Sequence, residues 1–210
     1  MKLKIIPLLL GCLCASQAYA DFNPVTLTSN SYTFDIVVET NVVPAMPALI
    51  TATVGGGTGK GDSTFYEQGF WNRTGGGLYS GVPIHGTVFT SQSDANTQYQ
   101  MPADYTINNT LLIDSGVTSG TLTLNTPLTC TNLSILGTGG SSGVTAIYTV
   151  NHQDGVTTET GNYNPGDWFG GANPAWYCGG RVSVGGGFSA TSTGGTSTGG
   201  AVGSNPRMYT

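Results

Sequence analysis

Two short motifs in this chain of 210 residues contain residue types that could do chemistry. Residues 139–143 match the G-x-S-x-G pattern of serine hydrolases, but that pattern needs a strand before the serine and a helix after it. Here the serine falls in a predicted loop that precedes a strand. Lys60 lies among glycines, yet Gly61 stands where a phosphate-binding loop needs Ser or Thr. Both motifs are therefore predicted to be loops without catalytic function.

Paired carboxylates are a second source of chemistry, because two of them on either side of a glycosidic bond make a glycosidase. The pairs nearest to predicted strands are Asp62 with Glu67 and Asp154 with Glu159, and Asp167 stands in a loop. Sequence spacing does not place any pair across a bond. We interpret these acids as turn formers and solvated strand edges.

The histidines, His85 and His152, are far apart in the sequence and belong to no H-E-x-x-H motif. We interpret them as surface or strand-end residues. No cofactor is expected. A structural calcium ion is compatible with a β-sandwich, because Ca²⁺ accepts irregular sets of loop carboxylates and carbonyls, although the chain has no EF-hand loop.

Aromatic side chains are the more informative group. They gather in residues 65–71 and again in the Gly- and Pro-rich residues 164–177. A flat ring suits the apolar face of a pyranose, and neighbouring polar groups can bond its hydroxyls. The candidate ligand contacts are Tyr66, Trp71, Trp168, Trp176, Tyr177 and Arg207. The alternative is that these rings close the open end of an apolar core.

The elements that must position these residues are short strands. Apolar and polar residues alternate over residues 32–39 and 144–151, which predicts one face for a core and one for water. Asp154-Gly155 between two strands predicts a tight hairpin turn. No segment has a capped helical pattern, so we expect an all-β fold, an antiparallel β-sandwich of jelly-roll type. The other predicted strands are residues 48–54, 63–71, 87–91, 109–114, 120–125, 132–136, 157–162 and 181–184.

The N-terminus has the features of a signal peptide. Lys2 and Lys4 precede a short apolar stretch, and residues 18–20 form an A-x-A cleavage site. A lipoprotein acylated at Cys12 is the alternative. Cleavage near Ala20 predicts a secreted, periplasmic or cell-surface chain without a transmembrane segment. Residues 21–210 are expected to form one β-sandwich domain, in which residues 189–204, rich in Gly, Ser and Thr, are a flexible segment.

Cleavage also changes the charge and the cysteine count. Loss of Lys2 and Lys4 leaves four basic against eleven acidic residues, so the net charge moves from −5 to −7. Such a surface excludes nucleic acid as a favoured partner. Only Cys130 and Cys178 remain, and in an oxidising compartment they are predicted to form a disulfide.

Several segments resemble a known group of proteins. Residues 148–160, followed by Asp167-Trp168-Phe169, resemble the strand, D-G-T/S turn, strand, D-W pattern of secreted bacterial galactose-binding-like β-sandwich modules. These modules often accompany polysaccharide-processing enzymes. The resemblance spans most of residues 30–210 and implies the jelly-roll fold, but no activity. In the resembling proteins further strands follow the segment at 205–209, so we expect either a fragment or an incomplete C-terminal sheet edge.

These observations predict a secreted, non-catalytic module that binds an extracellular polysaccharide or glycan, or acts as an accessory to proteins that do. The alternative is a structural or adhesive extracellular protein without a small-ligand site. In that case Trp168, Trp176 and Tyr177 are largely buried and share no groove. A polysaccharide hydrolase or lyase comes third, because it requires acids that converge in a cleft.

Overall fold

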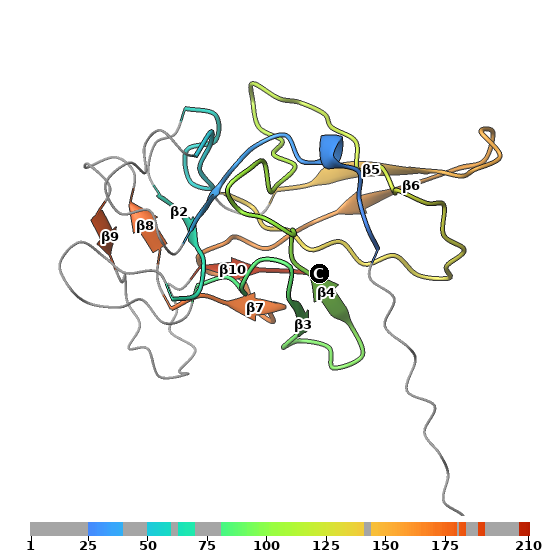
Figure 1. Ribbon diagram of the computed structural model, residues 1–210. Helices are drawn as coiled ribbons and strands as arrows, with labels where there is room; N and C mark the ends of the chain where they lie inside the picture. The colour runs from blue at the N-terminus through green and yellow to red at the C-terminus, as the bar shows by residue number, and fades with distance from the viewer. Residues whose placement is uncertain are drawn as a thin grey trace, which may run out of the picture.

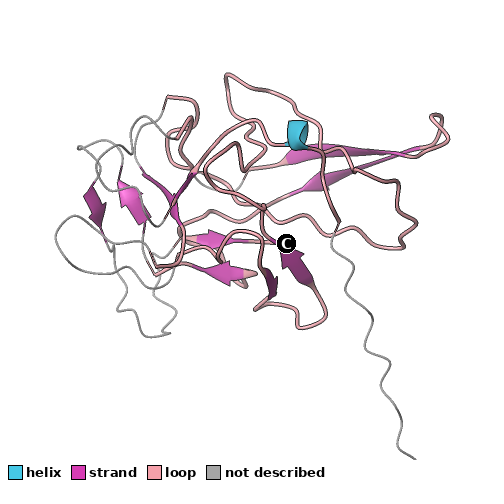
Figure 2. Ribbon diagram, in the orientation of Figure 1, coloured by secondary structure: helices cyan, strands magenta, loops and turns pink. Residues whose placement is uncertain are grey.

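The computed structural model describes residues 25–39, 50–59, 63–69, 81–140, 144–179, 181–183, 189–191 and 206–210. Within these ranges the regular elements are strands, and the helical content is one 3₁₀ turn, η1 (Ser29–Ser31) (Figure 2). The predicted all-β class is confirmed. None of the described residues belongs to a helix with the length and apolar character needed to cross a bilayer.

The largest sheet has four short strands: β1 (Val37–Val38), β2 (Ser63–Tyr66), β8 (Arg181–Ser183) and β9 (Ser189–Thr191). Their order is β1-β2-β8-β9, and Figure 1 labels the last three of these strands. The first pair is parallel and the other two are antiparallel. Strand β9 forms the beginning of the segment that was predicted to be flexible, and residues 192–204 lie outside the described residues.

Three further sheets have two antiparallel strands each. Strand β3 (Val88–Thr90) pairs with β4 (Gln98–Gln100), β5 (Ala146–Asn151) with β6 (Thr158–Tyr163), and β7 (Trp176–Tyr177) with β10 (Arg207–Met208). In the last pair Tyr177 lies opposite Arg207. The sequence analysis missed β4, β7 and β10, which are three residues or shorter and therefore too short to show a periodic pattern.

Three of the four sheets share one apolar cluster, and the β5–β6 hairpin contributes no side chain to it. The side chains of the cluster come from β1, β2, β3, β4 and β10 and from the loops between strands. Side-chain packing therefore connects sheets that no backbone hydrogen-bond ladder connects. Phe65 of β2 meets Trp168 edge to face, with 5.6 Å between the ring centroids. The members of the cluster are Ile36, Val37, Ala52, Phe65, Val82, Phe89, Tyr99, Met101, Tyr105, Trp168, Ala175, Cys178 and Met208.

The predicted hairpin is confirmed. Strands β5 and β6 pair through six residues each and project away from the rest of the chain at the right of Figure 1. Gly155 has a φ of +70°, the left-handed conformation that favours glycine. The Asp154 carboxylate accepts hydrogen bonds from the amides of Val156 and Thr157 at 2.9 and 2.8 Å. The core face expected for residues 144–151 is absent: Ala146 and Val150 are half-buried, and Val144 and Tyr148 are 43% and 39% exposed.

Four predicted strands are not strands where the structure describes them: residues 48–54, 109–114, 120–125 and 132–136. In the first three of these segments the chain makes isolated bridges instead, such as Phe34 to Thr110 and Leu27 to Leu124. The segments carry β-forming residues, but strand propensity is realised only where a neighbouring strand lies alongside for several residues. Leu122 and Leu133 remain 41% and 51% exposed.

A second correction concerns residues 32–39. The polar face of this segment was expected to meet water, but Asp35 and Glu39 are only 2% and 7% exposed. Residues 101–109 lie against this face: the Asn109 amide nitrogen donates to the Asp35 carboxylate at 2.7 Å and to the Tyr105 carbonyl at 3.3 Å. The segment is therefore buried on both sides.

Candidate functional site

Two of the predicted ligand contacts are core residues. Tyr66 on β2 is 1% exposed, and Trp168 is 3% exposed between Phe65 and Phe169. A ring with so little free surface has no face on which a sugar could stack. Trp71 lies outside the described residues.

Trp176 and Tyr177 are half-buried neighbours on β7. Successive side chains of a strand point to opposite faces, so these two rings do not form one platform. The Trp176 indole nitrogen donates to the Gly81 carbonyl at 3.0 Å, and its ring meets Phe89 edge to face. Trp176 therefore ties β7 to β3 and to the loop that follows β2.

Arg207 acts as a packing residue. It is 7% exposed, its guanidinium lies 5.4 Å from the centroid of the Tyr177 ring, and one of its terminal nitrogens donates to the Gly171 carbonyl. A cation held over an aromatic face stabilises both groups. This contact fixes β10 against β7.

The predicted Cys130–Cys178 disulfide is not present: both cysteines are free. Cys178 is 1% exposed inside the apolar cluster, and burial raises the pKa of its thiol. Cys130 stands in an exposed segment. One thiol thus faces the core and the other faces solvent.

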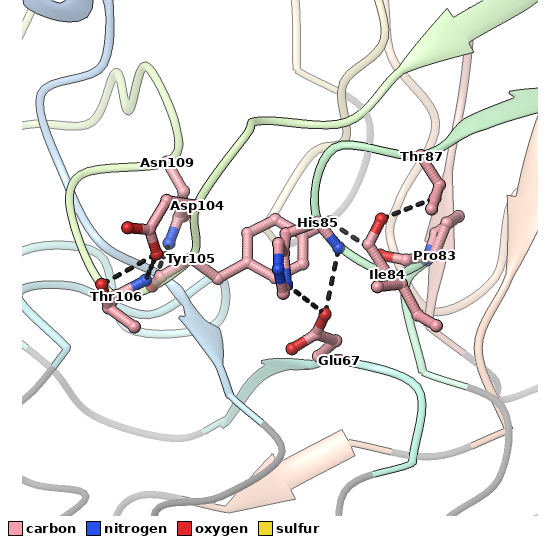
Figure 3. A network of polar contacts seen from close by, with 9 residues as sticks. All are labelled: Glu67, Pro83, Ile84, His85, Thr87, Asp104, Tyr105, Thr106 and Asn109. Carbon is pink, nitrogen blue, oxygen red and sulfur yellow. Dashed lines mark hydrogen bonds and ion pairs between the residues drawn. The ribbon is translucent and has the colours of Figure 1, made fainter.

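Glu67 and His85 form a pair that the sequence analysis did not recognise (Figure 3). The buried Glu67 carboxylate lies 2.7 Å from Nδ1 of His85 and accepts the backbone amide of the same residue at 3.0 Å. His85 is exposed at the surface, as predicted, with 52% of its side chain accessible. The buried carboxylate thus fixes the orientation of a ring that is half-exposed at the surface. The two partners are eighteen positions apart in the sequence, so no short motif predicts that they pair.

The same region holds an Asp35–Asn109 pair. The Asn109 side chain accepts the Ile36 amide at 3.1 Å and donates to Asp35, so it links the segment before β1 to residues 101–109. Tyr105 of that segment is 1% exposed and donates its hydroxyl to the Pro83 carbonyl at 2.8 Å (Figure 3). We call this group of five residues the acidic centre: Asp35, Glu39, Glu67, Tyr105 and Asn109.

Parallel pairing places two acids of this centre side by side. Val38 lies opposite Tyr66, so Glu39 and Glu67 come next in register at the same end of β1 and β2. The Glu67 amide donates to the Val38 carbonyl at 2.8 Å, which continues the ladder to this point. Burial, and then the like charges of Glu67 and Asp104, raise the pKa of Glu39.

Burial dominates the electrostatics of Asp35. It raises the pKa of this carboxyl to about 7, against the opposing effect of the Asn109 hydrogen bond, and the charges of Glu39 and Asp104 add to the rise. The acidic centre can therefore hold a proton in a pH range where an exposed aspartate cannot. Among the described residues no three His, Cys, Asp or Glu side chains converge in a way that would hold a metal ion.

A sequence signal for the acidic centre exists. Residues 36–38 are apolar at three successive positions, which is typical of a strand buried on both faces. Asp35 and Glu39 flank this run. Both lie two residues from Val37 and therefore on the same face of the strand. A strand with water on one face would carry a polar residue at position 37.

Comparison with known proteins adds no relative. No family model, curated protein or solved structure matches the chain. Functional statements therefore rest on the geometry described above.

Proposed function

We propose that this chain is an exported, non-catalytic β-protein that serves as a structural or adhesive component outside the cell. The observation that carries the proposal is the packing of the aromatic residues. Trp168, 3% exposed against Phe65, and Trp176, bonded to Gly81, contribute to the core instead of lining a groove. The signal peptide at residues 1–20 supports export.

The fold proposed with this function is the galactose-binding-like jelly roll. Small sheets that are antiparallel except for the β1–β2 pair support this proposal, as do the apolar cluster that three of them share and the D-G turn followed by Asp167-Trp168. Exposed apolar side chains on the projecting hairpin support an adhesive role, because Ile147 and Val156 are 76% and 85% exposed.

Carbohydrate binding is the second candidate, and one observation favours it. Tyr177 is half-buried, so part of its ring remains accessible beside the Arg207 guanidinium. A ring with a polar neighbour is the kind of group that binds a sugar. Of the sequence candidates that the structure describes, Tyr177 is the one best suited to contact an extracellular glycan.

A polysaccharide panel separates the two candidates. We expect residues 21–210 to give no glycan-array hit, no change in tryptophan fluorescence and no product release. A hit lost in Tyr177→Ala but kept in Tyr148→Ala, an exposed aromatic of the hairpin, would replace the structural proposal by carbohydrate binding. Turnover abolished by His85→Ala would make the protein an enzyme. In the producing cell the exported chain should stay with the surface fraction after washing, and complete recovery in the medium contradicts the proposal.

A further inference from the structure

The acidic centre concentrates carboxyl groups in a part of the core that has little to neutralise them. Asp35, Glu39 and Glu67 are 2%, 7% and 2% exposed. Burying a charged carboxylate is costly unless a cation or several donors compensate for the lost water. Glu67 has such compensation from His85.

Among the described residues Asp35 has no partner that can carry a positive charge, whereas Glu67 has the imidazole of His85. The titratable groups that act on it are acidic, namely Glu39 beyond β1 and Asp104 in the covering segment. Its donors are both neutral: the Asn109 side-chain amide at 2.7 Å and the backbone amide of Val37. The Tyr105 hydroxyl, from the same covering segment, donates its hydrogen bond to the Pro83 carbonyl. The His85 ring is hydrogen-bonded to Glu67. The geometry therefore favours a neutral, protonated Asp35.

We propose that Asp35 is a proton-binding site of the folded chain, and that release of this proton weakens the attachment of residues 101–109 to the segment before β1. A charged Asp35 is stabilised by hydration, and water reaches it only if the covering segment moves. Protonation of Asp35 therefore makes the fold more stable in a mildly acidic medium than in a neutral one. It is independent of the function proposed above.

The direction of the pH dependence of stability follows from the difference in proton binding between the folded and the unfolded chain. The pKa of Asp35 is raised in the folded chain, from an ordinary value of 3.8 to about 7, so its proton affinity is about a thousand-fold higher than in the unfolded chain. The folded state then binds more protons between these two values. The stability contributed by protonation is fully present below the ordinary value and is lost as the pH rises towards the folded value.

Thermal unfolding of residues 21–210 between pH 4 and 8, at constant ionic strength, tests the proposal. We expect the midpoint of wild type to fall as the pH rises to 7 and then to level off. Asp35→Asn keeps an acceptor for Asn109 but cannot titrate, so its midpoint should fall less than that of wild type, by the remainder that the raised pKa of Glu39 contributes. Asp94→Asn is the control, because Asp94 is exposed in the β3–β4 turn and has a lowered pKa; it should follow wild type.

Two direct readouts remain if Asp35→Asn does not fold. The carboxyl carbon of Asp35 in wild type should titrate by NMR with a midpoint near 7, and a midpoint below 5 overturns the proposal. The Ile36 amide, bonded to Asn109 at 3.1 Å, should lose exchange protection over the same interval, after correction for intrinsic exchange. A wild-type midpoint of unfolding that does not fall between pH 4 and 7 also overturns it.

Discussion

At the scale of single residues, glycines make room for aromatic side chains. The Tyr209 ring lies against Gly166 and Gly171, and its hydroxyl donates to the Asp167 carbonyl at 2.8 Å. A Cβ atom at Gly171 would stand 2.3 Å from the Tyr209 hydroxyl oxygen and 2.7 Å from the ring. At Gly166 and Gly171, two of the 33 glycines of the chain, the absence of a side chain lets the loop pack closely on the Tyr209 ring.

Gly171→Ala is therefore expected to destabilise the fold by about 1–3 kcal/mol, because the added methyl group displaces Tyr209 from a well-packed site. Gly170→Ala is the matched control: a Cβ there has no neighbour within 4 Å, so we expect a change within about 0.5 kcal/mol. Urea unfolding of the two variants measures the difference. Equal effects of the two substitutions would show that the contact with Tyr209 does not contribute.

At the scale of elements, the β5–β6 hairpin depends on its turn more than on packing. An isolated two-stranded hairpin is marginally stable in water. The Thr157 hydroxyl and amide and the Val156 amide all donate to Asp154, and these bonds lower the pKa of its carboxyl to about 2. His152 and Glu159 add an exposed pair across the turn at 3.0 Å.

We expect the hairpin turn to loosen in acid. Because the folded pKa of Asp154 is depressed, its contribution is present above the ordinary value of 3.8 and is lost as the pH falls to about 2. NMR of the Val156 and Thr157 amides over this interval should show a titration step in wild type. Asp154→Asn keeps the side-chain acceptor without the charge and should show no step. A step of equal size in the variant would assign it to another group.

At the scale of the whole molecule, one apolar cluster connects sheets whose ladders are separate. Cys178 stands in this cluster with 1% exposure, while Cys130 is at the surface. Access to the Cys178 thiol thus requires opening of the shared core, and access to Cys130 does not. The two thiols report on global and local structure respectively.

Thiol alkylation without a reductant should add one label to the native chain of residues 21–210 and two labels to the chain in denaturant. The second label should appear at the rate of global opening, because native burial excludes the reagent. Intact-mass analysis counts the labels. If neither thiol reacts in denaturant until a reductant is added, the two cysteines form the disulfide that export favours, and their placement here is wrong.

Local patterns in the sequence were sufficient for the features that neighbouring residues decide. The alternation of residues 144–151 and the Asp154-Gly155 turn predicted the hairpin, because turn geometry depends on the φ values that these residues allow. The all-β class follows in the same way from many short strands and the absence of a helical stripe. The surface position of His85 was also predicted correctly.

Tertiary structure decided which of these residues meet water and which meet one another. Asp35 and Glu39 have the alternation of a solvated strand face, yet residues 101–109 cover them. Glu67 finds His85 across eighteen residues, and Trp168 finds Phe65 across more than a hundred. A local pattern records what a residue prefers beside its neighbours in the chain. Burial depends on segments distant in sequence. The apolar run at residues 36–38 indicates a strand buried on both faces, but only the folded chain shows which segment covers it and which rings pack together.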